Sequence, residues 1–147
     1  MKPLLTVLLS LSLFSIASNG QIRKIPASVT EAFKTQYPKA TSIEWSDKLT
    51  GYAASFNDGD TKLVAHYKND ASWERTEEKI EFDSLPEDVK TAKDKSKYSE
   101  WDTGIIEKIQ LPSDKLEYRV QVEKSDFQKK NLYFTPEGKL LKDKITL

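Results

Sequence analysis

The sequence predicts an α+β protein built from two tandem helix-plus-antiparallel-sheet repeats, whose strands form one continuous sheet with the helices on one face. Two echoes along the chain lead to this prediction. The motif Ile25-Pro26-x-x-Val29-x-x-Ala32 returns 60 residues later as Leu85-Pro86-x-x-Val89-x-x-Ala92. A second set returns after 67 residues, where Tyr67, Ala71 and Trp73 correspond to Phe134, Gly138 and Leu140. A duplication of this size indicates two similar modules sharing one core. Because the offsets differ, we expect the extra residues in the loop Leu111–Lys115.

The first twenty residues are expected to form a secretory signal peptide. Lys2 gives a positive start, an apolar run extends from Leu4 to Ile16, and small residues precede a cleavage site near Gly20-Gln21. The run is short for a membrane-spanning helix, which needs about 20 apolar residues, so an uncleaved anchor is the disfavoured alternative. We therefore expect a periplasmic or secreted protein with no stable membrane insertion after cleavage.

The mature chain, 21–147, is expected to be a single domain, with repeat one at about 22–82 and repeat two at 83–147. Only Lys2 among the charged residues lies in the leader, so the mature chain has 22 basic and 23 acidic residues, and these are interspersed. This balance argues against nucleic acid as a partner. The sequence has no cysteine, so stability must come from packing without disulfides.

Both helices are predicted from a proline followed by apolar residues at helical spacing. Pro26 suits the first turn of a helix, and Pro38 ends the apolar pattern that follows it. The second helix begins at Pro86. Its apolar face holds only Val89 and Ala92, so we expect it to be more polar and more exposed.

Strands are predicted where apolar residues alternate with others. In the first repeat these are 52–56 and 63–67, joined by the turn Asn57-Asp58-Gly59-Asp60, and a strand from Trp73 after the turn Asn69-Asp70. In the second repeat they are 118–122 and 132–134, with Pro136-Glu137-Gly138 before 140–141. The segments Ile43–Trp45 and Ile105–Ile109 add a first strand to each repeat.

An antiparallel sheet covered by helices on one side exposes its other face. If the large apolar residues point toward the helices, the open face carries the residues that alternate with them, namely Ala53, Ser55, Val64, His66, Arg119, Gln121, Glu123 and Tyr133. A one-residue slip in any strand would move its residues to the other face.

These motifs resemble a known family. The pattern Ile25-Pro26-x-x-Val29-x-x-Ala32-Phe33-x-x-x-Tyr37-Pro38-x-Ala40, then Ile43-x-Trp45 and Tyr52-x-Ala54-x-Phe56, is similar to the exported beta-lactamase-inhibitor-like, PepSY-like proteins. The resemblance covers Ile25 to about Leu141. It implies tandem helix-plus-sheet modules whose curved sheet docks a partner protein, and no catalytic residue. One departure is Ala71, where the family's turn more usually has glycine.

The residues give little support to catalysis. His66 is the only histidine, and no glycine-rich nucleophile turn accompanies it, so a serine triad is disfavoured. One histidine without cysteine cannot supply the usual zinc ligands. The paired acids, such as Glu77-Glu78, lie in segments that look solvated, whereas a general acid needs an apolar pocket. We therefore expect no enzyme activity and no cofactor.

Calcium is the one metal with any support. Asp58 and Asp60 offer oxygen ligands, but the turn is too short for an EF-hand loop, and a plain hairpin turn explains the same residues.

Our hypothesis is a non-catalytic exported binding module. It would bind another exported or envelope protein or peptide through His66, Arg119, Gln121, Glu123 and Tyr133 on the open face, and inhibition is one form that this binding could take. Trp101, in a predicted loop, could either anchor that interface or fold back on the second helix. The alternative hypothesis is a small-ligand or calcium-responsive envelope protein with Asp58 and Asp60 as first contacts.

Overall fold

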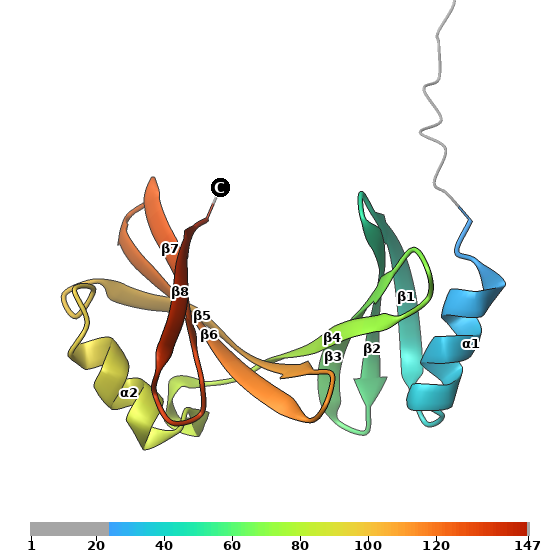
Figure 1. Ribbon diagram of the computed structural model, residues 1–147, viewed down its shortest axis with the longest axis horizontal. Helices are drawn as coiled ribbons and strands as arrows, with labels where there is room; N and C mark the ends of the chain where they lie inside the picture. The colour runs from blue at the N-terminus through green and yellow to red at the C-terminus, as the bar shows by residue number, and fades with distance from the viewer. Residues whose placement is uncertain (1–23, 147) are drawn as a thin grey trace, which may run out of the picture.

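The computed structural model describes residues 24–146, so the predicted signal peptide lies outside the described residues. The described chain forms one eight-stranded antiparallel sheet in which the strands follow one another in sequence order (Figure 1). The strands are β1 (Thr41–Lys48), β2 (Gly51–Asp58), β3 (Thr61–Lys68), β4 (Trp73–Lys79), β5 (Asp102–Leu111), β6 (Lys115–Ser125), β7 (Gln128–Phe134) and β8 (Leu140–Ile145). The helices are α1 (Ala27–Gln36), the short 3-10 helix η1 (Phe82–Ser84) and α2 (Glu87–Asp94). The predicted fold class is confirmed.

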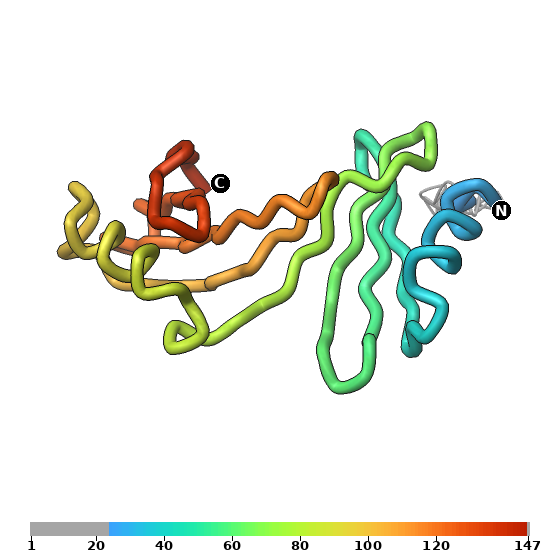
Figure 2. The backbone as a smooth tube through the Cα atoms, turned by 60° about the horizontal axis from the view of Figure 1, so that its bottom comes forward, coloured from blue at the N-terminus to red at the C-terminus, as the bar shows by residue number. Residues whose placement is uncertain are grey.

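The sheet bends into a U, with β1–β4 and α1 at one end and β5–β8 and α2 at the other (Figures 1 and 2). Both helices lie on the outside of the U. The joint between the two halves is the pairing of β4 with β5, which runs from Thr76 opposite Gln110 to Lys79 opposite Glu107. The inner side of the U carries no helix, and we call it the concave face.

Each helix begins after a proline, which makes no side-chain hydrogen bond to cap the helix N-terminus. Pro26 and Pro86 are the N-cap residues, and both are in the extended region, with ψ of 145° and 142°. In α1 the buried residues Val29 and Phe33 are one turn apart and face the sheet. α2 instead has two acidic residues in its first turn, where the helix dipole favours negative charge.

Two separate clusters of buried residues, one in each repeat, hold the helices to the sheet. The first centres on Phe33, whose ring contacts Phe56 edge-on at 4.9 Å and Trp45 at 5.3 Å between centroids. In the second repeat the corresponding helix position, four residues after Val89, is Lys93. This lysine is buried, and its Nζ donates to the carbonyl of Ser99 at 3.1 Å. A lysine in α2 at the position where α1 has Phe33 agrees with the prediction that the second helix is the less apolar one.

The two repeats match in register at their last strands. Tyr67 lies opposite Trp73, and Phe134 lies opposite Leu140, each just after a register shift. The turns that precede the last strands also correspond, because Ala71 and Gly138 both have positive φ, at 67° and 77°. The repeats differ in their first hairpins, since β5 and β6 are 10 and 11 residues long whereas β1 and β2 are 8 each.

Candidate functional site on the concave face

Five of the residues predicted for the open face lie on the concave face. In β6, Tyr118, Val120 and Val122 are buried in the second core, so the alternating residues Arg119, Gln121 and Glu123 point to the other side. Arg119 lies opposite Tyr133 of β7. His66 lies opposite Ala53 on one neighbouring strand and Arg75 on the other. The structure therefore brings these side chains to one surface, and their role in binding stays a prediction.

The middle of the concave face is occupied by an ion-pair network around Glu77. Its carboxylate accepts a hydrogen bond from Arg75 Nε at 2.8 Å and lies 3.2 Å from His66 Nε2. Arg119 Nη1 is 3.7 Å away and bonds more closely to the carboxylate of Glu107. The side chain of Glu77 is only 11% exposed. The network links β3, β4, β5 and β6 across the joint between the two repeats.

The charges of this network are fixed by their neighbours. Burial opposes ionisation of Glu77, but the hydrogen bonds from His66 and Arg75 and their positive charges lower its pKa to about 2. Burial likewise opposes the charge of Arg119, and its hydrogen bond to Tyr133 and the carboxylates of Glu107 and Glu77 raise its pKa. Glu77 is therefore a permanent anion at neutral pH. It serves as a counter-ion and cannot act as a general acid there.

Sequence reasoning missed three members of this network, Arg75, Glu77 and Glu107. The expectation that Glu77 is solvated is wrong, because strand β4 turns it onto the concave face between His66 and two arginines, Arg75 and Arg119. The available signal was the spacing Arg75-x-Glu77, which places opposite charges on one face of a strand. The sequence could not show that β3 and β6 would supply the other two partners of Glu77, His66 and Arg119.

Toward β7 and β8 the concave face becomes more exposed. The ammonium of Lys142 lies 4.3 Å from the centroid of the Tyr133 ring and 3.8 Å from the carboxylate of Glu117. Glu123 pairs with Lys129 at 2.9 Å. These pairs are accessible to a partner, because the side chains of Lys142 and Glu123 are 43% and 29% exposed.

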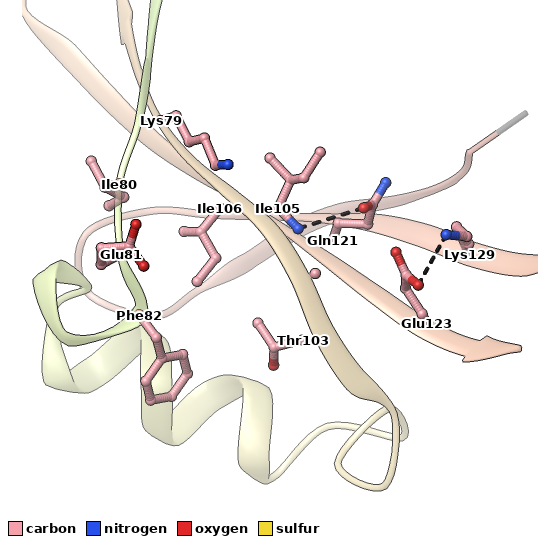
Figure 3. Close-up of a pocket in the computed structure, with 11 residues that line it drawn as sticks. Lys79, Ile80, Glu81, Phe82, Thr103, Ile105, Ile106, Gln121, Glu123 and Lys129 are labelled. Atoms are coloured by element: carbon pink, nitrogen blue, oxygen red, sulfur yellow. Dashed lines mark hydrogen bonds and ion pairs between the residues drawn. The ribbon is translucent and has the colours of Figure 1, made fainter. Parts of the chain in front are cut away.

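A hollow of about 530 Å³ lies where β4 leaves β5 (Figure 3). Here two residues of β5, Gly104 and Ile105, lie opposite the single residue Gln121, which makes a β-bulge. The Gln121 side chain accepts a weak hydrogen bond from the Ile105 N–H at 3.5 Å. A Cβ atom on Gly104 would lie 2.8 Å from the Gln121 oxygen and 2.9 Å from the Glu123 oxygen, so glycine leaves room for both side chains.

Trp101 lies outside the concave network. Its ring contacts Tyr98 edge-on at 5.1 Å between centroids, and it packs at the margin of the second core. Of the two readings of Trp101, this placement supports folding back on the second repeat. The same residue lines a hollow of about 310 Å³ together with Phe127 and Ile145.

The turn with Asp58 and Asp60 is an exposed hairpin turn. Asp58 pairs with Thr61 at the end of the β2–β3 ladder, and Gly59 has the positive φ of 61° that such a turn requires. Within residues 24–146 no group of three or more acidic or histidine side chains is placed to hold a metal ion. Calcium binding stays an untested prediction.

These features define a class: two-repeat α+β proteins with a helix-backed sheet and an open concave face. The family model described as "Putative beta-lactamase-inhibitor-like, PepSY-like" matches residues 18–64 and again 50–142. The chain therefore belongs to this PepSY-like family. No curated protein matches it.

Solved structures from Bacteroides share the fold. A DUF2874 family protein from Bacteroides uniformis is 25% identical with a TM-score of 0.75, over 83% of this chain and 90% of that one. A BLIP-like protein from Bacteroides fragilis is 29% identical with a TM-score of 0.72, over 84% and 87%. A Bacteroides eggerthii structure described as "putative periplasmic proteins" is 27% identical with a TM-score of 0.73, over 83% and 89%. In this chain, none of the described helices is long and apolar enough to cross a membrane.

Proposed function

We propose that this protein is a non-catalytic, exported binding module that holds another envelope or exported protein, or a peptide, on its concave face. The observation that carries the proposal is the ion-pair network around Glu77, which fixes Arg75 and Arg119 in the middle of an open, helix-free surface. Such pre-ordered charges lose little side-chain freedom when a partner covers them.

The chemistry of the face favours binding over catalysis. Glu77 is held as an anion by its lowered pKa, so it is not poised to donate a proton at neutral pH, and the carboxylate of Glu107 is paired with Arg119. His66, the one histidine of the sequence, contacts Glu77. These side chains offer charge and hydrogen bonds to a partner surface.

The descriptions of the relatives support a binding role and a location outside the cytoplasm. The family description and the BLIP-like protein from Bacteroides fragilis both carry the name of an inhibitor of beta-lactamase, and an inhibitor acts by binding a protein. The name of a relative does not transfer its target, since fold similarity does not carry specificity. The periplasmic description of the Bacteroides eggerthii relative supports a location outside the cytoplasm.

The test is a cross-linked pull-down from the native envelope with residues 21–147 as bait. The face variant is Glu123→Lys with Lys142→Glu, which reverses two accessible charges on the concave face and leaves the net charge unchanged. The matched control is Glu31→Lys with Lys34→Glu, the same exchange on the exposed side of α1.

We expect a protein that is enriched by the wild type and the control and is lost with the face variant. Two results would contradict the proposal. One is enrichment that the face variant does not change, and the other is a pull-down with no enriched protein or peptide.

A further inference from the structure

We propose that β5 carries a strand-addition site at 102–105, where an extended peptide segment with apolar residues at alternate positions binds as an additional strand. This inference goes beyond the proposed function, because the site is a free backbone edge at the joint between the repeats and does not depend on the ion-pair network around Glu77. The peptide is held mainly through its main chain, so this recognition differs in kind from a protein surface seated on the concave face.

The first observation is that β4 covers only part of β5. The ladder between the two strands ends with Lys79 opposite Glu107, and the last bond runs from the Ile80 N–H to the Ile106 carbonyl at 3.0 Å. Beyond this point the chain turns away into η1, while β5 continues and pairs only with β6. Within residues 24–146, no strand pairs with 102–105 on the side that β4 leaves. This stretch of β5, about 13 Å long, therefore has a free edge inside the sheet.

The second observation is the direction of the Thr103 main chain. Thr103 lies opposite Val122 and Ile106 lies opposite Val120, so the bulge between them adds one residue to β5. Thr103 and Ile106 therefore hold equivalent positions in the ladder, and their N–H and C=O groups point to the same side. Because the Ile106 carbonyl accepts the bond from Ile80 on the β4 side, the N–H and C=O of Thr103 point into the gap. They are the donor and the acceptor that an added strand needs.

The third observation is the hollow of about 530 Å³ beside this edge. Figure 3 shows Glu81 and Phe82 on one side of it, on the chain that leaves β4, and Thr103 of β5 on the other. Phe82 is 40% exposed and Ile105 is 49% exposed, so apolar surface is available for contact. A single extended segment can lie between these two walls. The edge of a folded domain brings further strands with it, which the wall of Glu81 and Phe82 excludes.

The side chains that suit the added strand follow from the register. A peptide residue opposite Thr103 turns its side chain to the face that Thr103 and Ile106 share. This is the face of the second core, because their partners in β6, Val122 and Val120, are buried there. On that face the hollow is lined by Ile106 and by Phe82, which lies beside α2 (Figure 3). An apolar residue at every second position of the peptide therefore makes the best contact.

The charges around the hollow favour a peptide without a strong net charge. The charged residues that line it are two basic and two acidic ones, Lys79, Lys129, Glu81 and Glu123. Glu123 and Lys129 already pair with each other at 2.9 Å. This balance gives no advantage to a strongly acidic or strongly basic segment, so the main chain and the apolar side chains decide the binding.

The first repeat provides an internal comparison. Thr103-Gly104-Ile105 corresponds to Thr41-Ser42-Ile43, which lies 62 residues earlier, and a register shift falls at the same place in β1. Ile43 is 43% exposed, close to the value of Ile105. However, β1 is the outer strand of the sheet, so no second wall faces its free edge. We therefore expect the peptide at β5 and not at β1, and Thr41 is the matched control for Thr103.

The experiment selects a phage-displayed library of random decapeptides on the chain 21–147, and measures the selected peptides as labelled synthetic probes by fluorescence anisotropy. Thr103→Pro removes the N–H that points into the gap, and Thr41→Pro is its control on β1. Phe82→Ala removes the apolar wall, and Phe127→Ala is its control at an exposed aromatic residue that lies outside the hollow. Peptides N-methylated at alternate residues test the same main-chain bonds with the wild-type protein, so the result does not depend on the folding of a variant.

We expect the selected peptides to share apolar residues at alternate positions. Thr103→Pro, and N-methylation along the edge of the peptide that faces β5, should each weaken binding by at least about tenfold. Phe82→Ala should weaken it by about tenfold as well, through lost apolar contact. Thr41→Pro and Phe127→Ala should leave the affinity within about twofold. Bound peptide should also slow the exchange of the Thr103 amide hydrogen and leave that of Thr41 unchanged.

Three results would each overturn the inference. The first is a selection that yields no binding peptide. The second is a set of peptides that bind folded Thr103→Pro as tightly as the wild type, or that protect the Thr41 amide in place of the Thr103 amide. The third is affinity that N-methylation does not change on either edge of the peptide, which would mean recognition by side chains alone. None of these results removes the proposed function, because the pull-down tests that separately.

Discussion

The hydroxyl of Tyr37 lies 2.5 Å from the hydroxyl of Thr76, and this contact ties the end of α1 to the last strand of its repeat. The second repeat contains a corresponding contact, in which the hydroxyl of Tyr98 donates to the carboxylate of Asp143 on β8. Thr76 also accepts a hydrogen bond from Trp73 Nε1 at 3.0 Å. Burial raises the pKa of Tyr37, so its hydroxyl stays protonated over the physiological range.

Thr76→Val should therefore destabilise the protein. Valine keeps the shape of threonine but leaves the Tyr37 hydroxyl and the Trp73 N–H without their partner, at a position that is only 5% exposed. The expected loss is about 1–3 kcal/mol in the free energy of unfolding, measured in urea. Thr61→Val, at the exposed start of β3, is the control and should change stability by less than about 0.5 kcal/mol. Equal losses in the two variants would show that the hydrogen bonds of Thr76 with Tyr37 and Trp73 contribute nothing to stability.

Removing the counter-ion of the concave face is expected to destabilise the protein and change its acid response. Glu77 has a pKa near 2 in the folded protein, against 4.5 when unperturbed. Because the folded pKa is the lower one, its contribution is present above pH 4.5 and is lost as the pH falls toward 2. Glu77→Gln should lower stability at pH 7 by up to about 3 kcal/mol and flatten the loss of stability below pH 4.5.

The measurement is urea unfolding at several pH values between 2 and 7. Glu74→Gln is the control, because Glu74 also bonds to Arg75 but is 47% exposed. Its variant should follow the wild-type pH dependence closely. If Glu77→Gln retained the full wild-type slope below pH 4.5, another carboxylate would have to account for it.

Gly138 is expected to be more sensitive to substitution than Gly59, although both have positive φ. A Cβ on Gly138 would lie 2.3 Å from the carbonyl oxygen of Asp88 in α2, whereas nothing lies within 4 Å of a Cβ on Gly59. Gly59→Ala should cost about 1–2 kcal/mol, the strain of a left-handed alanine. Gly138→Ala adds a backbone clash and should cost clearly more. Equal losses in thermal or urea unfolding would contradict the close packing of this turn on α2.

Ala71 offers the reverse experiment. It has a φ of 67° in the turn that corresponds to the one with Gly138, so alanine is strained where its counterpart is glycine. Ala71→Gly should raise stability by roughly 0.5–1 kcal/mol, because the relief of strain exceeds the added entropy of the unfolded chain. Ala32→Gly, inside α1, should instead lower it by about 1 kcal/mol. A loss of stability in both variants would show that the strain at Ala71 is negligible.

Leu49 and Phe127, the exposed apolar residues of two hairpin turns, should have no role in folding. Leu49→Ser and Phe127→Ser each remove a side chain that is at least 95% exposed, so we expect the free energy of unfolding to stay within about 0.5 kcal/mol of wild type. Phe33→Ser is the contrast, because Phe33 is 1% exposed at the centre of the first core and its loss should prevent stable folding. A large destabilisation by either serine variant would indicate a structural role for that side chain.

Sequence periodicity was sufficient for the fold because each repeat signals its elements locally. The prolines at 26 and 86, the helical spacing after them, and the alternation along β2, β3, β6 and β7 each require only neighbouring residues. The same alternation assigned His66, Arg119 and Tyr133 to the helix-free face, since a strand buried on one side must turn its other residues outward.

Trp101 and Glu77 show where local patterns stop being informative. The sequence places Trp101 in a loop and does not decide which way its ring points. Only the fold places that ring against Tyr98. Glu77 has a sequence neighbourhood typical of a solvated acid. Its low pKa depends on His66 from the neighbouring strand β3 as well as on Arg75 of its own strand.

The sequence by itself determined the duplication, the order of helices and strands, and which residues of each strand share a face. Tertiary structure alone decided which residues of β4 and β5 pair where the two repeats meet, how the sheet bends into a U, and that side chains from four strands meet around Glu77. The physical reason is that a period of two residues fixes the side of the sheet to which a residue points. The period carries no information about which strand lies beside the residue's own strand, and ion pairing between strands depends on that adjacency.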